Sequence, residues 1–206
     1  VNLFKEYQEL LGIPVDMDEL YGKLYNIALT GDTDCGGLLS YNYISGEPVT
    51  GLAEGRPLFV RSANDKFNLA NFMRAHLYAS VGVLKIGNDI LFNEEKIKVD
   101  RITGHGGLFR TKGVGQRVLA AAINSPISVM ETAGEGGAWG IALLAEYMDY
   151  TEETLTDFLN NHIFKNSKSV KIVPDQEIIC GYSEFMNRYK EGLEVEKVAV
   201  AYMKKI

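Results

Sequence analysis

Residues 97–147 constrain the fold most, because they twice repeat the order strand, glycine-rich turn, helix. In the first unit, apolar residues alternate with charged ones from Ile97 to Ile102, which is typical of a half-buried strand. The predicted strand ends at residues 103–107, where three glycines in four positions permit positive φ and let backbone N–H groups approach a ligand. A helix follows from about Gly113 and ends before Pro126.

The second unit begins with a short apolar strand at residues 127–130, followed by a glycine loop at 131–137 and a helix that reaches Tyr147. Strand, helix and strand joined by short connections predict a parallel pair with a right-handed crossover. Gly136, Gly137 and Gly140 predict that the second helix packs closely on the first. Since α/β sheets bind nucleotides at the carboxyl ends of parallel strands, this region is a candidate nucleotide site.

The remaining sequence predicts mostly helices around a few short strands. Residues 62–65 resemble a capping box and predict the start of one long helix that runs, buried, to about Ile90. Gly181 and Gly192 are predicted joints in a helical C-terminal segment. The other expected elements are helices near residues 3–11, 17–29 and 155–163, and strands at 38–44 and 170–173.

Composition excludes several classes of function. The net charge of −6, with the basic residues dispersed, argues against a nucleic-acid surface. No apolar run is long enough to span a bilayer, so no membrane partner is expected. Cys35 and Cys180 lie far apart without a C-x-x-C motif, which disfavours a disulfide framework or a zinc site and favours a reducing cytoplasm. The first residue is Val1, and we expect the chain to begin inside a longer gene product.

Several isolated polar residues have a functional and a structural interpretation. Asp32 and Asp34 have a spacing that could hold Mg²⁺, but the pair more often forms an Asx turn, which we favour. His76, inside the long helix, is interpreted as a satisfied core or edge histidine. His105 is interpreted as an exposed loop histidine with no catalytic role. Arg110, and Lys112 with it, either line a nucleotide mouth or are solvated, and we favour the solvated interpretation.

The order and spacing of these segments resemble the C-terminal domain of the FGGY carbohydrate kinases, and most closely xylulokinase-like members. The matching landmarks are residues 38–47, the long helix, the turn at 103–107, the segment 131–142 and the ending at 185–199. The resemblance covers most of residues 1–206. It implies an α/β domain of the actin-like, ribonuclease-H-like ATPase fold, with a mixed sheet flanked by helices. This domain forms one jaw of a two-domain kinase, whose N-terminal sugar-binding domain is expected to precede Val1.

The resemblance also implies the site residues. The family places its glycine turn against the adenosine of ATP, which carries over to Gly104, Gly106, Gly107 and Leu108, with a further adenosine contact at Asn2. The expected cofactors are ATP and, in the full-length enzyme, Mg²⁺. No catalytic or metal-binding residue is expected in this chain, because the aspartate base and the phosphate-gripping Gly-Thr loop belong to segments before Val1. The isolated chain is therefore expected to be inactive.

The expected partners are ATP, a ketose such as xylulose or a related sugar, the N-terminal domain and, as one option, a second copy of the chain. The sugar stays open for two reasons. The long helix has Tyr78-Ala79-Ser80 where many relatives have a Glu, and the glycine turn is followed by a longer connection, residues 108–112. One alternative is an actin-like regulatory or scaffold module that has lost catalysis. Another is dinucleotide binding with Glu131 as the ribose-binding acid, but Phe109 stands where that fingerprint needs its third glycine.

Overall fold

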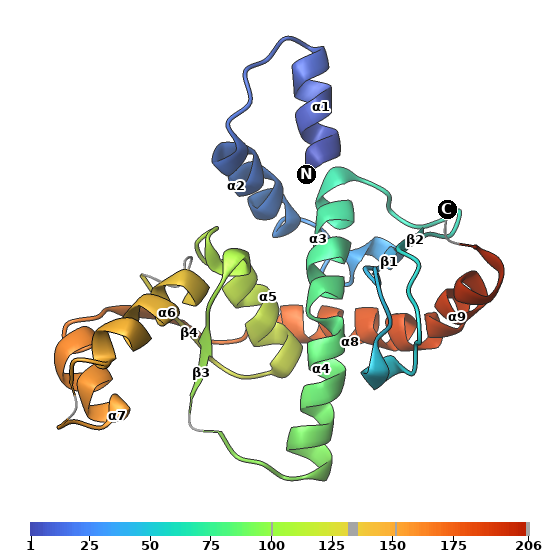
Figure 1. The fold of residues 1–206 in the computed structure, drawn as a ribbon. Helices are drawn as coiled ribbons and strands as arrows, with labels where there is room; N and C mark the ends of the chain where they lie inside the picture. The colour runs from blue at the N-terminus through green and yellow to red at the C-terminus, as the bar shows by residue number, and fades with distance from the viewer. Residues whose placement is uncertain (100, 132–135, 151, 205–206) are drawn as a thin grey trace.

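The computed structural model describes residues 1–99, 101–131, 136–150 and 152–204. Helices dominate, and they surround two small sheets (Figure 1). The elements in chain order are α1 (Asn2–Leu10), α2 (Met17–Ala28), η1 (Cys35–Gly37), β1 (Leu39–Tyr41), η2 (Pro48–Thr50), β2 (Leu58–Val60), α3 (Leu69–Ser80), α4 (Gly82–Asp89), η3 (Ile90–Glu94), β3 (Ile102–Gly104), η4 (Gly107–Phe109), α5 (Val114–Ile123), β4 (Ile127–Met130), α6 (Gly136–Tyr147), α7 (Leu155–Phe158), η6 (Leu159–Ile163), β5 (Ser169–Ile172), α8 (Gln176–Glu191) and α9 (Leu193–Tyr202).

The larger sheet has the order β3-β4-β5 and is mixed. β3 pairs with β4 in parallel, with Thr103 opposite Ser128, so the predicted parallel pair is confirmed. β5 adds to the other side of β4 in the antiparallel sense. β1 and β2 form a separate antiparallel pair. The expectation of a mixed sheet flanked by helices is therefore correct.

The core lies where α2, α3, α5 and α8 meet. Arg74 of α3 is buried and donates from Nε to the carbonyl of Ala28 and from Nη2 to that of Leu29, at 2.7 and 2.9 Å. These carbonyls lie at the C-terminus of α2, where helix carbonyls lack intrahelical partners. Tyr78 is buried and donates its hydroxyl to the carbonyl of Thr33. Side chains of α3 thus fasten α2 and the following loop to the core.

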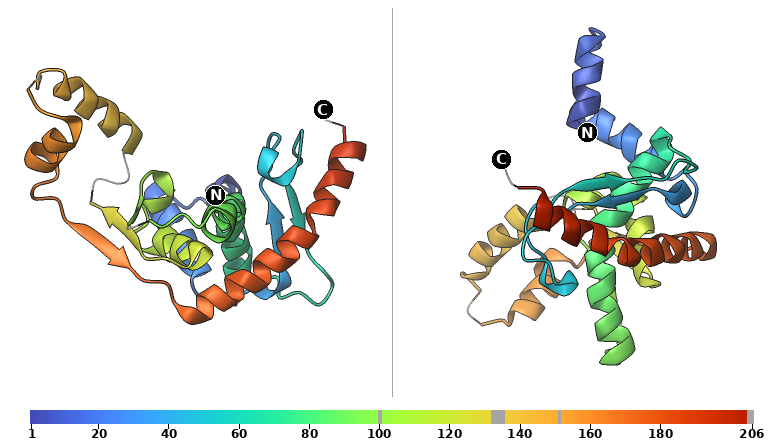
Figure 2. Two further views of the ribbon diagram at one scale, coloured as in Figure 1. Left: turned by 90° about the horizontal axis from the view of Figure 1, so that it is seen from below. Right: turned by 90° about the vertical axis from the view of Figure 1, so that its right-hand side faces the viewer.

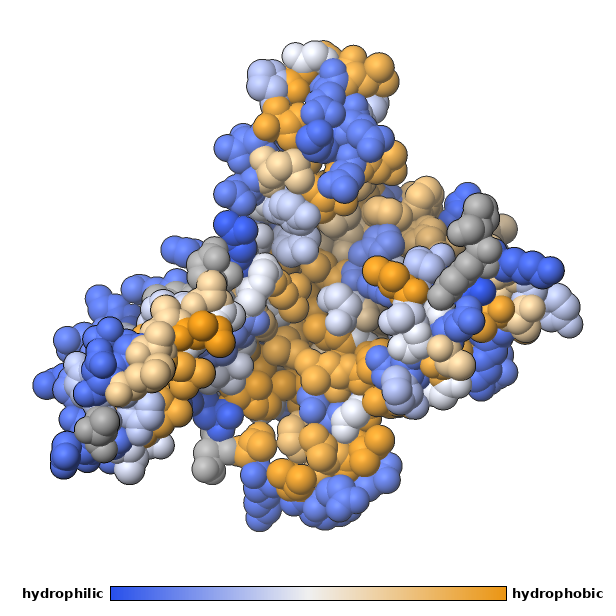
Figure 3. All heavy atoms as spheres, in the orientation of Figure 1, coloured by the Kyte–Doolittle hydropathy of each residue, from blue (hydrophilic) through white to orange (hydrophobic). Residues whose placement is uncertain are grey.

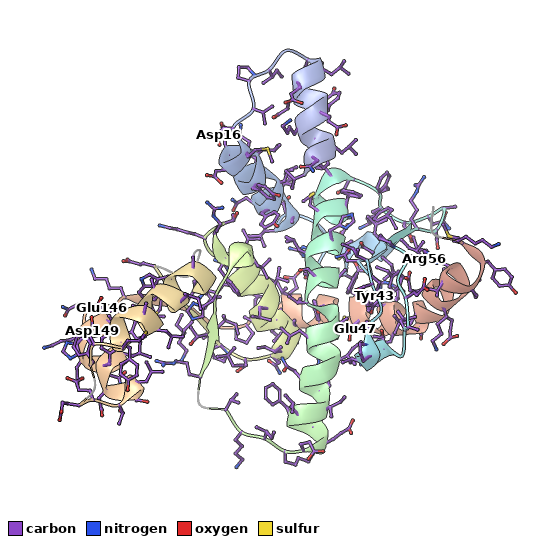
Figure 4. All side chains as sticks on the ribbon, viewed as in Figure 1. Asp16, Tyr43, Glu47, Arg56, Glu146 and Asp149 are labelled. Atoms are coloured by element: carbon purple, nitrogen blue, oxygen red, sulfur yellow. The ribbon has the colours of Figure 1, made fainter. Side chains whose placement is uncertain are left out.

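On the opposite side of the core, the segment between β1 and β2 is held to α9 (Figure 4). Glu196 of α9 is buried and accepts a hydrogen bond from the backbone N–H of Arg56 at 2.5 Å. The Arg56 side chain donates from Nε to the carbonyl of Met203 at 2.6 Å. These contacts fix the C-terminal helix against the small sheet.

The long helix predicted from residues 62–65 to Ile90 is wrong at its start and in its continuity. The N-cap is Asn68, whose side chain accepts from the N–H of Asn71, whereas the Asp65 carboxylate instead accepts from the Ser62 N–H within a turn. α3 ends at Val81, whose φ of −113° and ψ of 5° break the helical path. The prediction of a buried helix holds for α3. It fails for α4, which projects from the body of the molecule (Figure 1) and exposes Leu84 by 48%.

The strand predicted across residues 97–102 is also wrong over most of its length, because β3 begins only at Ile102. The helical segment instead continues through the π-helical η3, and the N–H of Ile97 bonds to the carbonyl of Leu91. Ile97 and Val99 are both 48% exposed. Their alternation with charged residues therefore belongs to an exposed connection and not to a sheet strand.

The predicted packing of α6 on α5 is wrong. No atom lies within 4 Å of a Cβ placed on Gly137 or Gly140, and no residue of α6 is buried. Trp139 of α6 instead contacts Phe164, with ring centroids 5.6 Å apart, and Tyr147 contacts Phe158. α6 therefore packs on the segment of α7 and η6, away from the core (Figure 2).

The C-terminal helices confirm one of the two predicted joints. Gly192 separates α8 from α9. Gly181 lies inside α8, where a Cβ would overlap the backbone of Thr33, so its role is close packing. Among the described residues, none of the helices is both long and apolar enough to cross a membrane.

Candidate functional site

The glycine turn begins at the carboxyl end of β3 and holds its shape through two different glycines. Gly104 is buried against the Phe109 ring, which a Cβ at Gly104 would overlap. Gly106 has a φ of +101° and a ψ of −177°, a conformation that side-chain-bearing residues rarely adopt. The ring of Phe109 thus fills the space under the turn. These two glycines are required by the turn itself, whether or not a ligand binds.

Gly107 is the member of the turn that faces outward, and Leu108 follows it. Gly107 is exposed, its φ lies outside the positive range, and a Cβ there would meet no atom within 4 Å. Leu108 is half-buried, and its carbonyl oxygen would lie 2.5 Å from a Cβ on Gly115 of α5. Gly115 therefore lets α5 approach the turn, while Gly107 leaves bare backbone open to a ligand.

Two hollows border this outward side of the turn, and Tyr25 lines both. The first, here called the α3 hollow, has a volume of about 570 Å³, within the range of small-molecule sites. The second, the α2 hollow, has a volume of about 680 Å³. The α3 hollow is lined by Val1, Leu3, Phe4, Tyr25, Asn42, Phe72, Met73, His76, Leu77, Ser80 and Leu108. The α2 hollow is lined by Met17, Asp18, Tyr21, Tyr25, Gly107, Arg110 and Thr111.

The α3 hollow is mainly apolar and aromatic. Figure 1 shows the start of α1 beside the first turns of α3, and the rings of Phe4 and Phe72 meet there with centroids 6.4 Å apart. On the face shown in Figure 3, apolar atoms gather in the recess in the middle of the molecule. Leu108 connects this hollow to the glycine turn, whereas Asn2 is exposed and is not among the lining residues. An apolar hollow with a few polar groups fits a flat heteroaromatic ring.

His76 supplies one of those polar groups. Its Nδ1 lies 2.9 Å from Oγ of Ser40, and its ring stacks against Phe59 and meets Phe72 edge-on. Burial lowers the pKa of this histidine below its ordinary value. The interpretation as a satisfied, partly buried histidine is confirmed. Sequence reasoning missed that its helix position borders a hollow beside the glycine turn.

The α2 hollow carries the charge. Arg110 lines it next to Gly107, with a side chain that is 59% exposed and lies 3.8 Å from the carboxylate of Asp18. This places Arg110 at the rim of a hollow, whereas the sequence favoured a plain solvated position. Lys112 is not among the lining residues. The exposed guanidinium gives this rim a group that can pair with an anion, beside the exposed carboxylate of Asp18.

The loop with Asp32 and Asp34 does not form a metal site. Oδ1 of Asp34 accepts from the N–H of Gly36, as in an Asx turn, and its other oxygen lies 3.1 Å from Arg188. Asp32 accepts from Asn71 and from Lys66, and these two contacts, the Asn71 hydrogen bond first, lower the pKa of its carboxyl group. The described residues contain no cluster of three potential His, Cys, Asp or Glu ligands. The residues of this loop therefore do not fit Mg²⁺.

His105 is exposed, as expected for a loop histidine. It lies beside the start of α6, where a Cβ placed on Gly136 would be 3.2 Å from the Cβ of His105. Cys35 and Cys180 are both free, and burial raises the pKa of the Cys35 thiol. Glu131 is exposed at the end of β4. These residues add no chemistry to the turn. The ribose role considered for Glu131 gains no support, since Phe109 stands where the dinucleotide fingerprint needs its third glycine and its ring packs against Gly104.

Residues 13–148 match the family model for the C-terminal domain of the FGGY family of carbohydrate kinases. The match covers well over half of the chain. This chain belongs to the FGGY family. The FGGY match includes the glycine turn and α5, so the resemblance seen in the sequence is confirmed.

Solved structures of FGGY kinases share the fold. A gluconate kinase from Lactobacillus acidophilus superposes with a TM-score of 0.63 at 18% identity, over 87% of this chain and 34% of that one. A xylulose kinase from Rhodospirillum rubrum superposes with a TM-score of 0.56 at 17% identity, over 85% of this chain and 34% of that one. A glycerol kinase from Plasmodium falciparum, solved with ADP, superposes with a TM-score of 0.55 at 17% identity, over 89% of this chain and 34% of that one.

These comparisons establish an actin-like ATPase fold and leave the activity to be argued. The chain spans about a third of the length of the kinases it matches. No curated protein matches it by sequence.

Proposed function

We propose that this chain is the nucleotide-binding side of an ATP-dependent sugar kinase, which transfers a phosphoryl group from ATP to a sugar hydroxyl. In the complete enzyme, residues 1–206 form the C-terminal domain, and an N-terminal domain supplies the sugar pocket. A ketose such as xylulose is the proposed substrate, because the solved structures that share the fold include xylulose kinases. The proposed location is the cytoplasm, where ATP is available.

The observation that carries this proposal is the placement of the glycine turn between two hollows of different chemistry. The α3 hollow is aromatic and fits a base, and the α2 hollow has the exposed guanidinium of Arg110 and fits an anion. Gly107 and Leu108 lie between them, with backbone that no side chain covers at Gly107. Adenosine bound across Gly107 and Leu108 would direct its phosphates away from the apolar hollow. Asn2, exposed at the start of α1, remains a proposed contact at the rim.

Phosphoryl transfer also needs an orienting carboxylate and Mg²⁺ near the γ-phosphate. Among the described residues, the paired carboxylates of Asp32 and Asp34 are engaged by Lys66, Asn71 and Arg188. We therefore assign the catalytic base and the Mg²⁺ site to the N-terminal part of the complete kinase. The isolated chain is expected to release no ADP above a blank in a coupled assay with xylulose, ribulose, gluconate or glycerol.

Gly107→Val in the complete kinase tests the nucleotide site. The position has an ordinary backbone and free space, so valine should leave the melting temperature unchanged while its side chain intrudes on the nucleotide. We expect the KM for ATP to rise by roughly tenfold, with the KM for the sugar unchanged. Gly106→Val is a poorer probe, since its positive φ costs about 1–2 kcal/mol regardless of ligand. An unchanged KM for ATP in a folded Gly107→Val enzyme would exclude the turn as the site.

A further inference from the structure

The hydrogen bonds around Ser40 determine which nitrogen of His76 carries the proton. Ser40 is buried on β1, and its Oγ lies 2.9 Å from both Oδ1 of Asn42 and Nδ1 of His76. A hydroxyl has one proton, so it can donate to only one of these two neighbours. The other neighbour must donate to the hydroxyl oxygen, or the contact is lost.

The amide of Asn42 decides between the two arrangements. Its Nδ2 donates to the backbone carbonyl of His76 at 3.5 Å, which leaves Oδ1 to accept the proton of Ser40. Rotating the amide would place Oδ1 against that carbonyl, and two acceptors would then face each other. With the proton of Ser40 given to Asn42, Nδ1 of His76 has to be the donor to Ser40. In the neutral ring, Nε2 is then an acceptor with a free lone pair.

The imidazole of His76 lies among aromatic rings where it lines the α3 hollow. Phe59 stacks on the imidazole with centroids 5.8 Å apart, and Phe72 meets it at 4.5 Å and 75°. His76 lines the hollow, and within the described part of the chain Nε2 has no hydrogen-bond partner. Burial lowers the pKa of His76, which favours the neutral ring and keeps this lone pair available at neutral pH.

The geometry points to His76 as a base-selecting residue that accepts a hydrogen bond at Nε2 from an amino group on the edge of a bound purine. The ligand class is therefore a 6-aminopurine nucleotide. A 6-oxopurine places a carbonyl oxygen, another acceptor, against the same lone pair. This inference rests on the proposed nucleotide site and adds to it a reason for selecting adenine. Ser40 and Asn42 act as positioning residues, because their hydrogen bonds fix the tautomer of His76.

Binding of two nucleotides that differ at this position tests the inference. The dissociation constants of ATP and inosine triphosphate for the 206-residue chain are measured by calorimetry. We expect ATP to bind roughly tenfold more tightly, the effect of one matched hydrogen bond replaced by two facing acceptors. His76→Asn keeps a donor near the position of Nδ1 but removes the acceptor at Nε2, so the two affinities should become equal. His162→Asn, on η6 outside both hollows, is the matched control and should keep the wild-type ratio.

The tautomer gives a second readout, which can be measured in the wild-type chain and in a variant of Ser40. The ¹⁵N chemical shifts of His76 in the wild-type chain should report a protonated Nδ1 and an unprotonated Nε2, and Ser40→Ala should remove this preference and lower the ATP to inosine triphosphate ratio. A protonated Nε2 in wild type, or equal affinities of wild type for the two nucleotides, would overturn the role of His76 and leave the nucleotide site standing. Binding of neither nucleotide would overturn the nucleotide site itself, and the role of His76 with it.

Discussion

The two strand–glycine–helix units of this chain share the same order of elements and have opposite environments. In the first, every residue of α5 except Arg117 is buried, and the helix packs on α8 and β4. In the second, α6 has no buried residue, and its aromatic side chains contact the peripheral segment of α7 and η6. Both helices are largely apolar and rich in glycine or alanine. Composition alone therefore does not separate a core helix from a peripheral one.

The difference lies in what each glycine faces. A Cβ on Gly115 of α5 would lie 2.5 Å from the carbonyl oxygen of Leu108, so this glycine permits close packing with the turn. A Cβ on Gly140 of α6 would meet nothing within 4 Å. α5 also has a buried polar anchor, Gln116, which bonds to both neighbouring strands. The first unit is thus fixed in place by specific contacts, which makes it the better platform for a binding site.

The largest expected effect comes from paired glycine substitutions. Gly115→Leu should destabilise the chain by about 1–3 kcal/mol or more, because the new side chain overlaps the backbone of Leu108. Gly140→Leu should be neutral or stabilise by up to about 1 kcal/mol, since leucine favours the helix more than glycine does. Urea denaturation of both variants measures the difference. Equal destabilisation by the two would mean that α6 packs as tightly as α5.

The next effect concerns the polar anchor. Gln116 donates from Nε2 to the carbonyls of Ile127 and Val170, at 2.8 and 2.6 Å. Gln116→Met keeps the volume but leaves these carbonyls without their donor, and should cost about 1–3 kcal/mol. Glu146→Met on the exposed face of α6 (Figure 4) is the control and should change stability by less than about 0.5 kcal/mol. A neutral Gln116→Met would show that the anchor contributes nothing to the difference between the units.

The smallest expected effect is a pH dependence of the stability, caused by the partly buried His76. Burial places the folded-state pKa of His76 below its ordinary value of 6.5. The unfolded chain then takes up the proton first, so the stability is fully present above pH 6.5 and is lost as the pH falls towards the folded-state pKa. The urea concentration at the unfolding midpoint of the wild type should decrease as the pH is lowered from about 7.5 to about 5. The decrease should be smaller in His76→Asn. If the urea midpoint changed equally with pH in the wild type and in His76→Asn, then His76 would not be the cause.

The sequence predicted the parts of the fold that depend on local signals. The parallel pair of β3 and β4, the ends of α5 and the Asx turn at Asp34 follow from the strand–helix–strand order, helix-stopping residues and turn chemistry. It failed at the start of α3, where Asn68 outcompetes the similar cap signal at Ser62. It also failed for the packing of α6, because the sequence of an apolar helix does not show which other element the helix contacts.

The candidate site was predictable only in part. Gly106 and Gly107 stand out in the sequence, but nothing local shows that one is fixed by its φ and that the other is open to solvent. The sequence allowed Ser40 and Asn42 to be placed on the same face, since residues two apart on a strand share a face. Their meeting with α3 depends on tertiary packing between segments more than thirty residues apart. Such contacts leave no trace in the spacing of one sequence.

The most direct test of the account is where ATP perturbs the molecule. The chain labelled with ¹⁵N is titrated with ATP, and the amide shifts of the two units are compared. The account predicts the largest changes at Gly106, Gly107 and Leu108, with smaller ones at the start of α1 and none in residues 136–147 of α6. Changes confined to α6, or no change at the glycine turn at saturating ATP, would contradict it.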